Sequence, residues 1–252
     1  MTPRPEPRHR SERLQQLHDL CPEGSRIADV GCDHALLPIA LMTSGRASHA
    51  IAADLRPGPL EFARRNIDHA NLAHAIEVRL GDGLEPISPD DRIDLVYIAG
   101  MGTRSILDIL CATNGERKDG LDALGITHLV AQSPQDLSPL RAYIHRELER
   151  EVVDEIILYE DEQLYHTLVV RLDRMAPRAW SALDDADRII GAPLILKHGE
   201  ERALALYLER KIERVTIRLE GLRRAKSPDN ARIAEVERML ATLERISAPF
   251  LS

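Results

Sequence analysis

The chain alternates short apolar segments with longer ones whose apolar residues recur at helical spacing, and its first apolar segment has the clearest context. Residues 26–30 (Arg-Ile-Ala-Asp-Val) form a run that ends at Gly31. Such a run predicts a buried parallel strand, and glycine permits a sharp turn that a ligand can approach closely. Pro38 fits the first turn of a following helix, where its missing N–H is not needed. The segment therefore predicts a strand–turn–helix unit of the kind that binds nucleotides.

The same alternation continues to residue 172 and predicts an open α/β sheet. Further strands are predicted over residues 50–54, 76–80, 93–99 and 128–132, helices over residues 11–20, 57–70, 103–111 and 137–151, and a polar loop over residues 114–125. Residues 152–159 and 164–172 then predict two strands joined by a loop too short for a helical crossover. The fold class is therefore α/β, with a Rossmann-like sheet whose last strand is antiparallel. Class I methyltransferases have this organisation, whereas ordinary NAD domains do not.

From residue 200 onward the apolar spacing becomes heptad-like. It alternates steps of four and three residues at Leu208, Ile212, Val215, Leu219 and Leu222, and again at Ile233, Val236, Leu240 and Leu243. Residues 226–229 predict the turn between two helices, with Ser227 as the helix cap and Pro228 in the first helical position. The pattern predicts an antiparallel coiled-coil hairpin at the C-terminal end of the chain.

Length and charge add a domain division. The 252 residues, 44% of them hydrophobic, suffice for one large domain with an appendage, and we predict a Rossmann-like domain over residues 1–175. A connector, in which Trp180 packs the boundary, and the helical hairpin occupy residues 176–252. The net charge of −8 and the 3% of aromatic residues disfavour indiscriminate nucleic-acid binding. Residues 197–226, however, carry nine Lys or Arg against five Glu, which fits either a phosphate-binding surface or a solvated helix with internal ion pairs.

Cysteine content and hydropathy narrow the cellular setting. Cys21, Cys32 and Cys111 fit no metal-ligand spacing and are most simply small buried residues in a reducing compartment. No apolar run approaches the ~20 residues of a membrane span, and the first residues lack the apolar core of a signal peptide. We therefore expect a cytoplasmic enzyme with neither a metal nor a membrane partner. The sequence does not fix the oligomeric state, and a monomer is the simplest expectation.

Acidic residues follow three of the predicted strands and indicate the class of ligand. Gly31 is followed by Asp33 and not by a second glycine, so the pyrophosphate fingerprint G-x-G-x-x-G is absent. A carboxylate there repels a diphosphate but can hold a cationic, phosphate-free nucleoside such as S-adenosylmethionine. Asp54 ends the second strand at the place of a ribose-binding carboxylate. Asp82, between Gly81 and Gly83, can accept from an adenine amino group or can simply shape a turn.

Met101, Arg13 and His34 each have two possible roles. Gly100 and Gly102 bring bare backbone to the ligand-binding edge of the sheet, and Met101 between them lines a cofactor or target pocket or belongs to the core. Arg13 either lies across the mouth of the nucleotide corner or is solvated. His34 either contacts a target base or makes a structural hydrogen bond to a neighbouring turn.

Four segments together resemble the bacterial tRNA (adenine-22-N1)-methyltransferase family. They are residues 11–14 (Ser-Glu-Arg-Leu), 29–35 (Asp-Val-Gly-Cys-Asp-His-Ala), 81–84 (Gly-Asp-Gly-Leu) and 100–102 (Gly-Met-Gly). Their order and spacing match along the whole Rossmann part, and the C-terminal hairpin is similar to that family's second domain. Two positions differ: Gly102-Thr103 replaces a glycine pair, and Gln132-Ser133-Pro134 replaces the family's Gln-Pro-Asn after the fifth strand, where the target base should sit.

The resemblance implies an S-adenosylmethionine-dependent enzyme that methylates N1 of an adenine in the D-loop region of tRNA. Residues placed at the catalytic site are Asp33, His34 and Met101; at the cofactor Asp29, Gly31, Asp33, Asp54, Asp82, Gly83 and Gly100; and at the RNA Arg13, Gln132, Lys211 and Arg214. Within the cofactor set, Gly31 and Asp33 correspond to the methionine part. Asp54 corresponds to the ribose.

The chemistry leaves alternatives open. Adenine N1 has a free lone pair, so positioning, and stabilisation of the cationic product, matter more than a strong base. The absence of an Asn-Pro-Pro-Tyr motif speaks against transfer through the exocyclic N6. A methyltransferase for another RNA position or for a small molecule keeps the same fold and cofactor. A non-catalytic tRNA-binding module also remains open because of Gln132-Ser133-Pro134, and an NAD-dependent oxidoreductase fits least.

Overall fold

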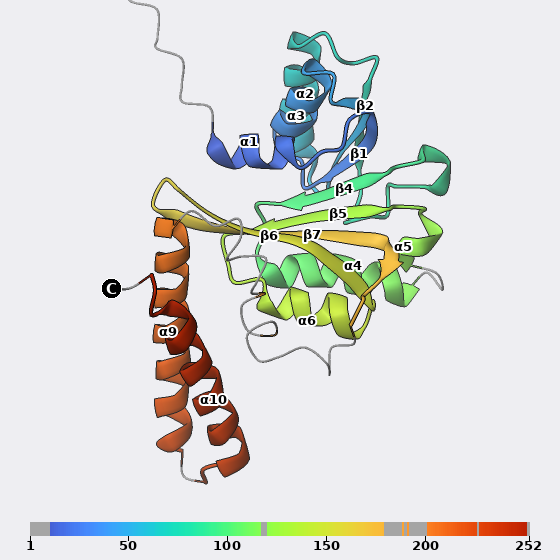
Figure 1. Ribbon diagram of the computed structural model, residues 1–252. Coiled ribbons are helices and arrows are strands. Elements are labelled where there is room, and N and C mark those ends of the chain that lie inside the picture. The colour runs from blue at the N-terminus through green and yellow to red at the C-terminus, as the bar shows by residue number, and fades with distance from the viewer. Residues whose placement is uncertain are drawn as a thin grey trace, which may run out of the picture.

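A seven-stranded sheet with the strand order β3-β2-β1-β4-β5-β7-β6 forms the centre of the protein (Figure 1). The computed structural model describes residues 11–116, 120–178, 188, 191, 201–225 and 227–250. The strands are β1 (Ser25–Val30), β2 (Ala47–Asp54), β3 (Ile76–Leu80), β4 (Leu95–Ala99), β5 (His128–Ser133), β6 (Arg150–Glu160) and β7 (Gln163–Met175). The first five are parallel, and β7 runs antiparallel to both β5 and β6. The predicted sheet and its antiparallel hairpin are confirmed, and β7 lies between β5 and β6.

Helices cover both faces of the sheet. One face carries α1 (Glu12–Asp19), α2 (Leu36–Thr43) and α3 (Pro57–His69); the other carries α4 (Thr103–Glu116), α5 (Gly120–Ala123) and α6 (Ser138–Arg146), and a short 3-10 turn, η1 (Pro89–Asp91), precedes β4. The central strands β1, β4 and β5 are largely apolar on both faces because each face packs against helices. Strand β4, for example, sends Val96 and Ile98 into one core and Leu95 and Tyr97 into the other.

Helix α1 has a fixed position beside the carboxyl end of the sheet. Ser11 caps it as predicted, by accepting a hydrogen bond from the Leu14 N–H at 3.2 Å. Leu17 packs in the core, and the hydroxyl of Tyr97 donates to its carbonyl oxygen at 3.0 Å. The C-terminal half of α1 is therefore held against β4.

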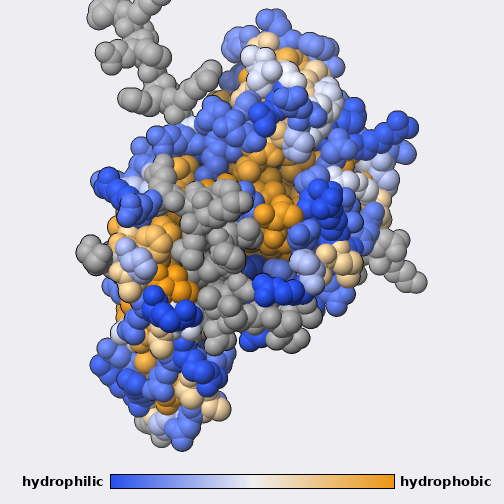
Figure 2. All heavy atoms as spheres, in the orientation of Figure 1, coloured by the Kyte–Doolittle hydropathy of each residue, from blue (hydrophilic) through white to orange (hydrophobic). Residues whose placement is uncertain are grey.

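The C-terminal hairpin consists of α9 (Glu201–Arg223) and α10 (Asn230–Ser247) and extends away from the sheet (Figure 1). Its apolar stripe is buried between the two helices and against Ile157 of β6 and Leu164 of β7. The face seen in Figure 2 carries many hydrophilic residues, as expected for helices that bury one stripe each. The supercoil of a coiled coil stays a prediction, as does the domain boundary after residue 175.

The predicted cap of the second hairpin helix is wrong. Asp229, and not Ser227, is the N-cap of α10: its side chain accepts from the N–H groups of Ala231 and Arg232, both at 3.1 Å. A carboxylate also carries a negative charge, which the positive end of the helix dipole favours.

Two predicted boundaries also differ from the structure. Helix α4 continues to Glu116, and α5 occupies part of the predicted polar loop. The predicted helix over residues 137–151 ends at Arg146, because Glu149 has a left-handed backbone (φ 53°) and β6 begins at Arg150. Most of the connector, Trp180 included, lies outside the described residues. Among the helices that are described, none has the length and apolarity needed to cross a membrane.

Candidate functional site

A cavity of about 1060 Å³ opens where β1, β2 and β4 end. Open α/β sheets bind their ligands at this edge. The residues predicted for the catalytic and cofactor sites all line it: Asp29, Gly31, Asp33, His34, Asp54, Asp82, Gly83, Gly100 and Met101. Arg13 lines it too. The structure thus brings together segments that lie far apart in the sequence, because all of them except the one that contains Arg13 lie at the carboxyl end of a strand or closely follow one.

The turn after β1 is tightly wound. Gly31, Asp33 and Ala35 all have left-handed backbones, with φ of 74°, 49° and 56°. The N–H groups of Gly31 and Cys32 both donate to the carbonyl oxygen of Ala53, at 2.8 and 3.0 Å, which ties this turn to β2. A Cβ atom at Gly31 would lie 2.0 Å from the terminal methyl of Met101. Glycine is therefore required here by both backbone and space, and Met101 packs against the turn.

Two buried carboxylates form the inner wall of the cavity. Asp54 accepts a hydrogen bond from the Arg56 N–H at 2.9 Å. Burial raises the pKa of Asp29 to about 7; the negative charge of Asp54 acts in the same direction, whereas the positive charge of Arg13 lowers it. Asp82 is exposed at the rim. The cavity therefore has an inner end that favours a cation.

Asp33 and His34 stand at the mouth of the cavity. His34 Nε2 lies 3.6 Å from Asp33 Oδ2, and both side chains are largely exposed. The His34 ring packs edge-on against Phe62, with 5.2 Å between ring centroids. The hydrogen bond between His34 and the neighbouring helix involves its backbone and not its ring: the Asn66 side chain donates to the His34 carbonyl oxygen at 2.9 Å. The imidazole therefore faces the cavity opening.

Arg13 is held in place, which decides against a freely solvated side chain. Its backbone N–H donates to the Glu160 carboxylate at 3.2 Å, and the Ser11 hydroxyl donates to the same carboxylate at 3.0 Å. Its guanidinium donates to Gln132 Oε1 at 3.4 Å and lies over the Tyr165 ring, 5.1 Å from the centroid. Arg13 therefore lies at the end of the cavity near β5 and β7.

Gln132 is buried, and this burial contradicts its predicted role as a direct RNA contact. Its side chain is 0% exposed, and its amide donates to Thr167 Oγ1 at 3.1 Å. A position near the end of a central strand, where Gln16 and Arg13 of α1 contact the side chain, leaves no surface for a macromolecule. The side chain instead orients Arg13.

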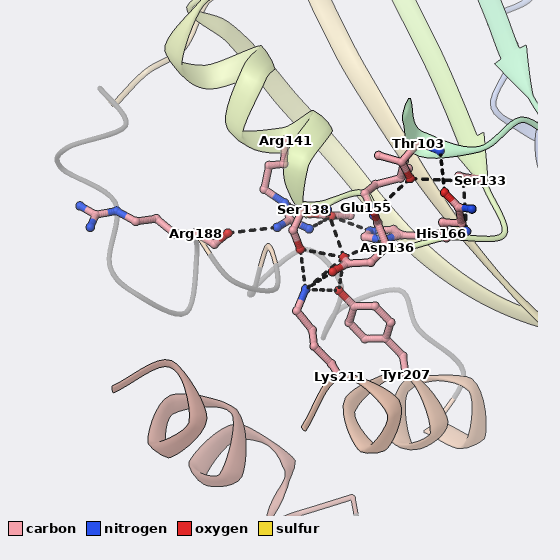
Figure 3. A network of polar contacts seen from close by, with 12 residues as sticks. Thr103, Ser133, Asp136, Ser138, Arg141, Glu155, His166, Arg188, Tyr207 and Lys211 are labelled. Atoms are coloured by element: carbon pink, nitrogen blue, oxygen red, sulfur yellow. Dashed lines mark hydrogen bonds and ion pairs between the residues drawn. The ribbon is translucent and has the colours of Figure 1, made fainter. Parts of the chain in front are cut away.

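Lys211 is likewise buried, with 8% exposure, and its ammonium points into a polar network, which contradicts its predicted role as a direct RNA contact (Figure 3). Its ammonium donates to the two carboxylate oxygens of Asp136 at 3.1 and 3.0 Å and to the Tyr207 hydroxyl at 2.9 Å. Burial lowers the pKa of Lys211 to about 8. Burial alone would raise the pKa of Asp136, but the charge of Lys211 and the hydrogen bonds from Ser138 hold it well below its usual range. The lysine charge is thus neutralised inside the protein.

The same network continues into a buried ion pair (Figure 3). Arg141 Nε donates to both carboxylate oxygens of Glu155 at 3.0 Å. His166 Nδ1 accepts from the Leu137 N–H at 3.1 Å, so the neutral ring carries its proton on Nε2 and donates it to Glu155 at 2.7 Å. Burial lowers the pKa of His166, which keeps the ring neutral. The network joins the segment after β5 to the hairpin strands and to α9.

A second, smaller cavity of about 40 Å³ lies between α9 and the segment after β5. Arg214, which was predicted to contact RNA, is exposed at its edge together with Arg210. Pro134 and Tyr165 line both cavities. No sequence motif marks Tyr165, because only its place near the start of β7, next to the hairpin turn, brings it to the two cavities. Among the described residues, no group of three or more His, Cys, Asp or Glu is arranged to hold a metal.

Comparisons with known proteins agree with this geometry. A family model described as "Methyltransferase domain" matches residues 10–168. The chain is 38% identical over 160 residues to the tRNA (adenine(22)-N(1))-methyltransferase of Bacillus subtilis (strain 168), and the match covers 63% of this chain and 63% of that protein, less than two thirds of its length.

Solved structures extend the likeness over nearly the whole chain. The B. subtilis m1A22 tRNA methyltransferase TrmK superposes with a TM-score of 0.76 at 27% identity, covering 94% of this chain and 98% of that one. A Streptococcus pneumoniae protein solved in complex with S-adenosyl-L-methionine superposes with a TM-score of 0.73 at 26% identity, covering 94% and 99%. The likeness therefore includes the C-terminal helices as well as the sheet.

Proposed function

The chain belongs to the methyltransferase-domain family, and from that premise we propose that it transfers a methyl group from S-adenosylmethionine to N1 of an adenine in tRNA. The observation that carries the proposal is the gathering of Gly31, Asp54, Asp82 and Met101 around one cavity, in a chain 38% identical over 160 residues to a tRNA (adenine(22)-N(1))-methyltransferase. Since tRNA is modified in the cytoplasm, the proposal includes that location, and a monomer suffices for it.

The cavity suits this cofactor better than a dinucleotide. Among the described residues that line it, six are acidic (Asp29, Asp33, Asp54, Asp82, Glu85, Asp108) and two are arginines (Arg13, Arg56). Such a wall attracts a ligand with a sulfonium and an ammonium and repels a pyrophosphate. The absence of the glycine fingerprint favours the same choice. An NAD-dependent oxidoreductase therefore fits this site poorly.

Each cofactor-site residue has a proposed task. Asp54 accepts from the ribose hydroxyls, and Asp82 with Gly83 meets the adenine. Asp29, with the bare backbone of Gly31, receives the ammonium of the methionine part. Asp33 orients that part from the mouth of the cavity. When bound, S-adenosylmethionine supplies a methyl group made electrophilic by the positively charged sulfur.

The remaining residues serve the target base. Gly100 and Met101 border the site of transfer, next to the turn that contains Gly31. Adenine N1 presents a lone pair, so the chain needs only to hold the base in line and exclude water. His34 lies at the mouth, where it can contact the base, and the Asp33 carboxylate beside it favours the cationic product.

RNA contacts are proposed for Arg13 and for the exposed Arg214, with Arg210 beside it. The base itself must leave its stack, or lie exposed in a bend of the tRNA, to reach the cavity. The proposed two-domain organisation, residues 1–175 and 176–252, then has a purpose, because α9 presents arginines next to the segment after β5.

Methyl transfer from labelled S-adenosylmethionine to bulk unmodified tRNA tests the proposal. We expect nucleoside analysis to find 1-methyladenosine with the wild type, and none with Asp33→Ala. Binding of S-adenosylmethionine without any labelled nucleoside would keep the cofactor and refute the tRNA substrate. Tight binding of NADH without binding of S-adenosylmethionine would refute the whole class.

Cofactor affinity is expected to rise with pH because of Asp29. The carboxyl group has a pKa of about 7, so it is mostly neutral at pH 6 and mostly charged at pH 8. A cationic ammonium prefers the charged form, so affinity for S-adenosylhomocysteine should increase by up to roughly tenfold between these pH values. Calorimetric titration at pH 6 and pH 8 measures this. Asp29→Asn should bind S-adenosylhomocysteine more weakly, and its affinity should change little with pH. If the affinity of this variant still rose as steeply with pH as that of the wild type, a group other than Asp29 would be responsible for the rise.

A further inference from the structure

We infer that Tyr165 and Pro134 form the slot that receives the target base, at the end of the cavity opposite Asp54 and Asp82. The inference rests on the proposed function and names a binding site within it. Asp54 ends β2 and Tyr165 lies on β7, four strand positions away in the sheet order. At ~4.8 Å per strand this is a separation of ~19 Å. The cavity therefore extends well beyond the end that suits a nucleoside cofactor.

The size of the cavity points the same way. Small-molecule sites typically measure ~300–1,000 Å³, and this one, at about 1060 Å³, is slightly larger than that range. A methyl transfer needs two ligands in one enclosure. The end of the cavity beside β1, β2 and β3 is assigned to the cofactor. The end beside β5 and β7 remains for the target base.

Tyr165 offers the chemistry that a nucleobase needs. Aromatic rings bind bases by stacking, and this chain has few such rings, 3% of its residues. The ring is half-buried and carries the Arg13 guanidinium over it, 5.1 Å from the centroid. Within the described part of the chain, the Tyr165 hydroxyl makes no hydrogen bond. Because Arg13 covers one face of the ring, we assign the opposite face to the base.

Pro134 provides a fixed second wall. The Gln163 side chain donates to the Pro134 carbonyl at 3.0 Å, and the Gln135 N–H donates to Ser133 Oγ at 3.0 Å. Two residues further on, Asp136 is held by Lys211 of α9 (Figure 3). A compact apolar ring on a backbone held at these points can pack against the face of a purine. The slot lies where the sequence departs from the related family, at Gln132-Ser133-Pro134.

The slot also has an exit for the RNA backbone. Beyond Pro134 and Tyr165 the smaller cavity begins, and the exposed Arg210 and Arg214 of α9 line it. A base that enters the slot would place its flanking phosphate toward these arginines. The charge of the wall thus changes from acidic at the cofactor end to basic at the RNA end.

The inference is tested with Tyr165→Leu and Tyr165→Phe. Loss of one stacked base costs ~1–3 kcal/mol, so kcat/KM for tRNA should fall about 5- to 150-fold in the leucine variant. The phenylalanine variant should stay within about threefold of the wild type, because it keeps the ring. Affinity for S-adenosylhomocysteine, measured by calorimetry, should be unchanged in both. A 2-aminopurine at the methylated position should be quenched by the wild type and not by Tyr165→Leu.

Tyr159→Leu is the matched control. Tyr159 lies on the neighbouring strand β6 and has Arg202 over its ring at 5.4 Å, but it lines neither cavity. It should keep the activity of the wild type.

The outcomes distinguish a failure of the base slot from a failure of the proposed function. Wild-type activity with an unimpaired Tyr165→Leu overturns the slot and leaves the proposed function standing. Equal losses in Tyr165→Phe or Tyr159→Leu also overturn it, because the hydroxyl or the fold would then be responsible. A wild type that methylates no tRNA adenine overturns the proposed function, and the slot with it.

Discussion

Gly31→Ala is expected to weaken the binding of S-adenosylmethionine by roughly 10- to 100-fold. Gly31 has φ of 74°, where a side chain costs ~1–2 kcal/mol. Its new Cβ would also lie 2.0 Å from the terminal methyl of Met101. The methionine is flexible enough to move, but the space next to it is the cavity. Strain in the turn and the displaced Met101 side chain therefore both weaken the binding of S-adenosylmethionine. Calorimetric titration of the purified variant measures the loss.

Two further variants separate these causes. Gly45 has nearly the same backbone angle, φ of 72°, but an added Cβ would meet nothing within 4 Å. Gly45→Ala should therefore lose stability and keep its cofactor affinity. Adding Met101→Ala to Gly31→Ala should restore part of the affinity by removing the clash. If Gly31→Ala bound S-adenosylmethionine as tightly as the wild type, the turn would not be part of the cofactor site.

The cofactor end of the cavity was predictable because its residues follow strands. Asp54 ends a segment whose apolar pattern predicts a strand, and Asp82 and Gly100 closely follow two other such segments. Parallel strands end at one edge of the sheet, so local patterns suffice to bring such residues together. Neither long-range contacts nor burial had to be known in advance.

The RNA end was harder, because there the outcome depends on burial. A lysine on a basic helix suggests a solvent-facing charge, yet Lys211 is paired with Asp136, 75 positions earlier. One local signal was available: Lys211 lies four residues from both Tyr207 and Val215, which places it on the buried face of α9. Tyr165 shows the opposite case. No local pattern assigns it to a cavity, and only the folded hairpin places it beside Pro134.

Glu155→Gln is expected to lower the free energy of unfolding by ~3–5 kcal/mol, the usual result of removing one partner from a buried ion pair. Glu155 is 0% exposed and Arg141 2%. The carboxylate is surrounded by donors: Arg141 and the Nε2–H of His166. A glutamine amide fits the space, but its NH₂ group cannot accept from any of them, and Arg141 loses its counter-ion. Urea unfolding at pH 7 measures the difference.

Asp173→Asn is the matched control, and pH identifies the mechanism. Asp173 pairs with Arg171 at a more exposed position, so its loss should cost about 0–1 kcal/mol. Burial alone would raise the pKa of Glu155, but Arg141 and His166 lower it overall. Stability from this carboxylate is therefore present above its ordinary pKa of 4.5 and is lost as the pH falls below it. The difference in the free energy of unfolding between the wild type and Glu155→Gln should become smaller below pH 4.5. If Glu155→Gln lost no more unfolding free energy at pH 7 than Asp173→Asn does, then packing, and not the charge, would hold α6 to β6.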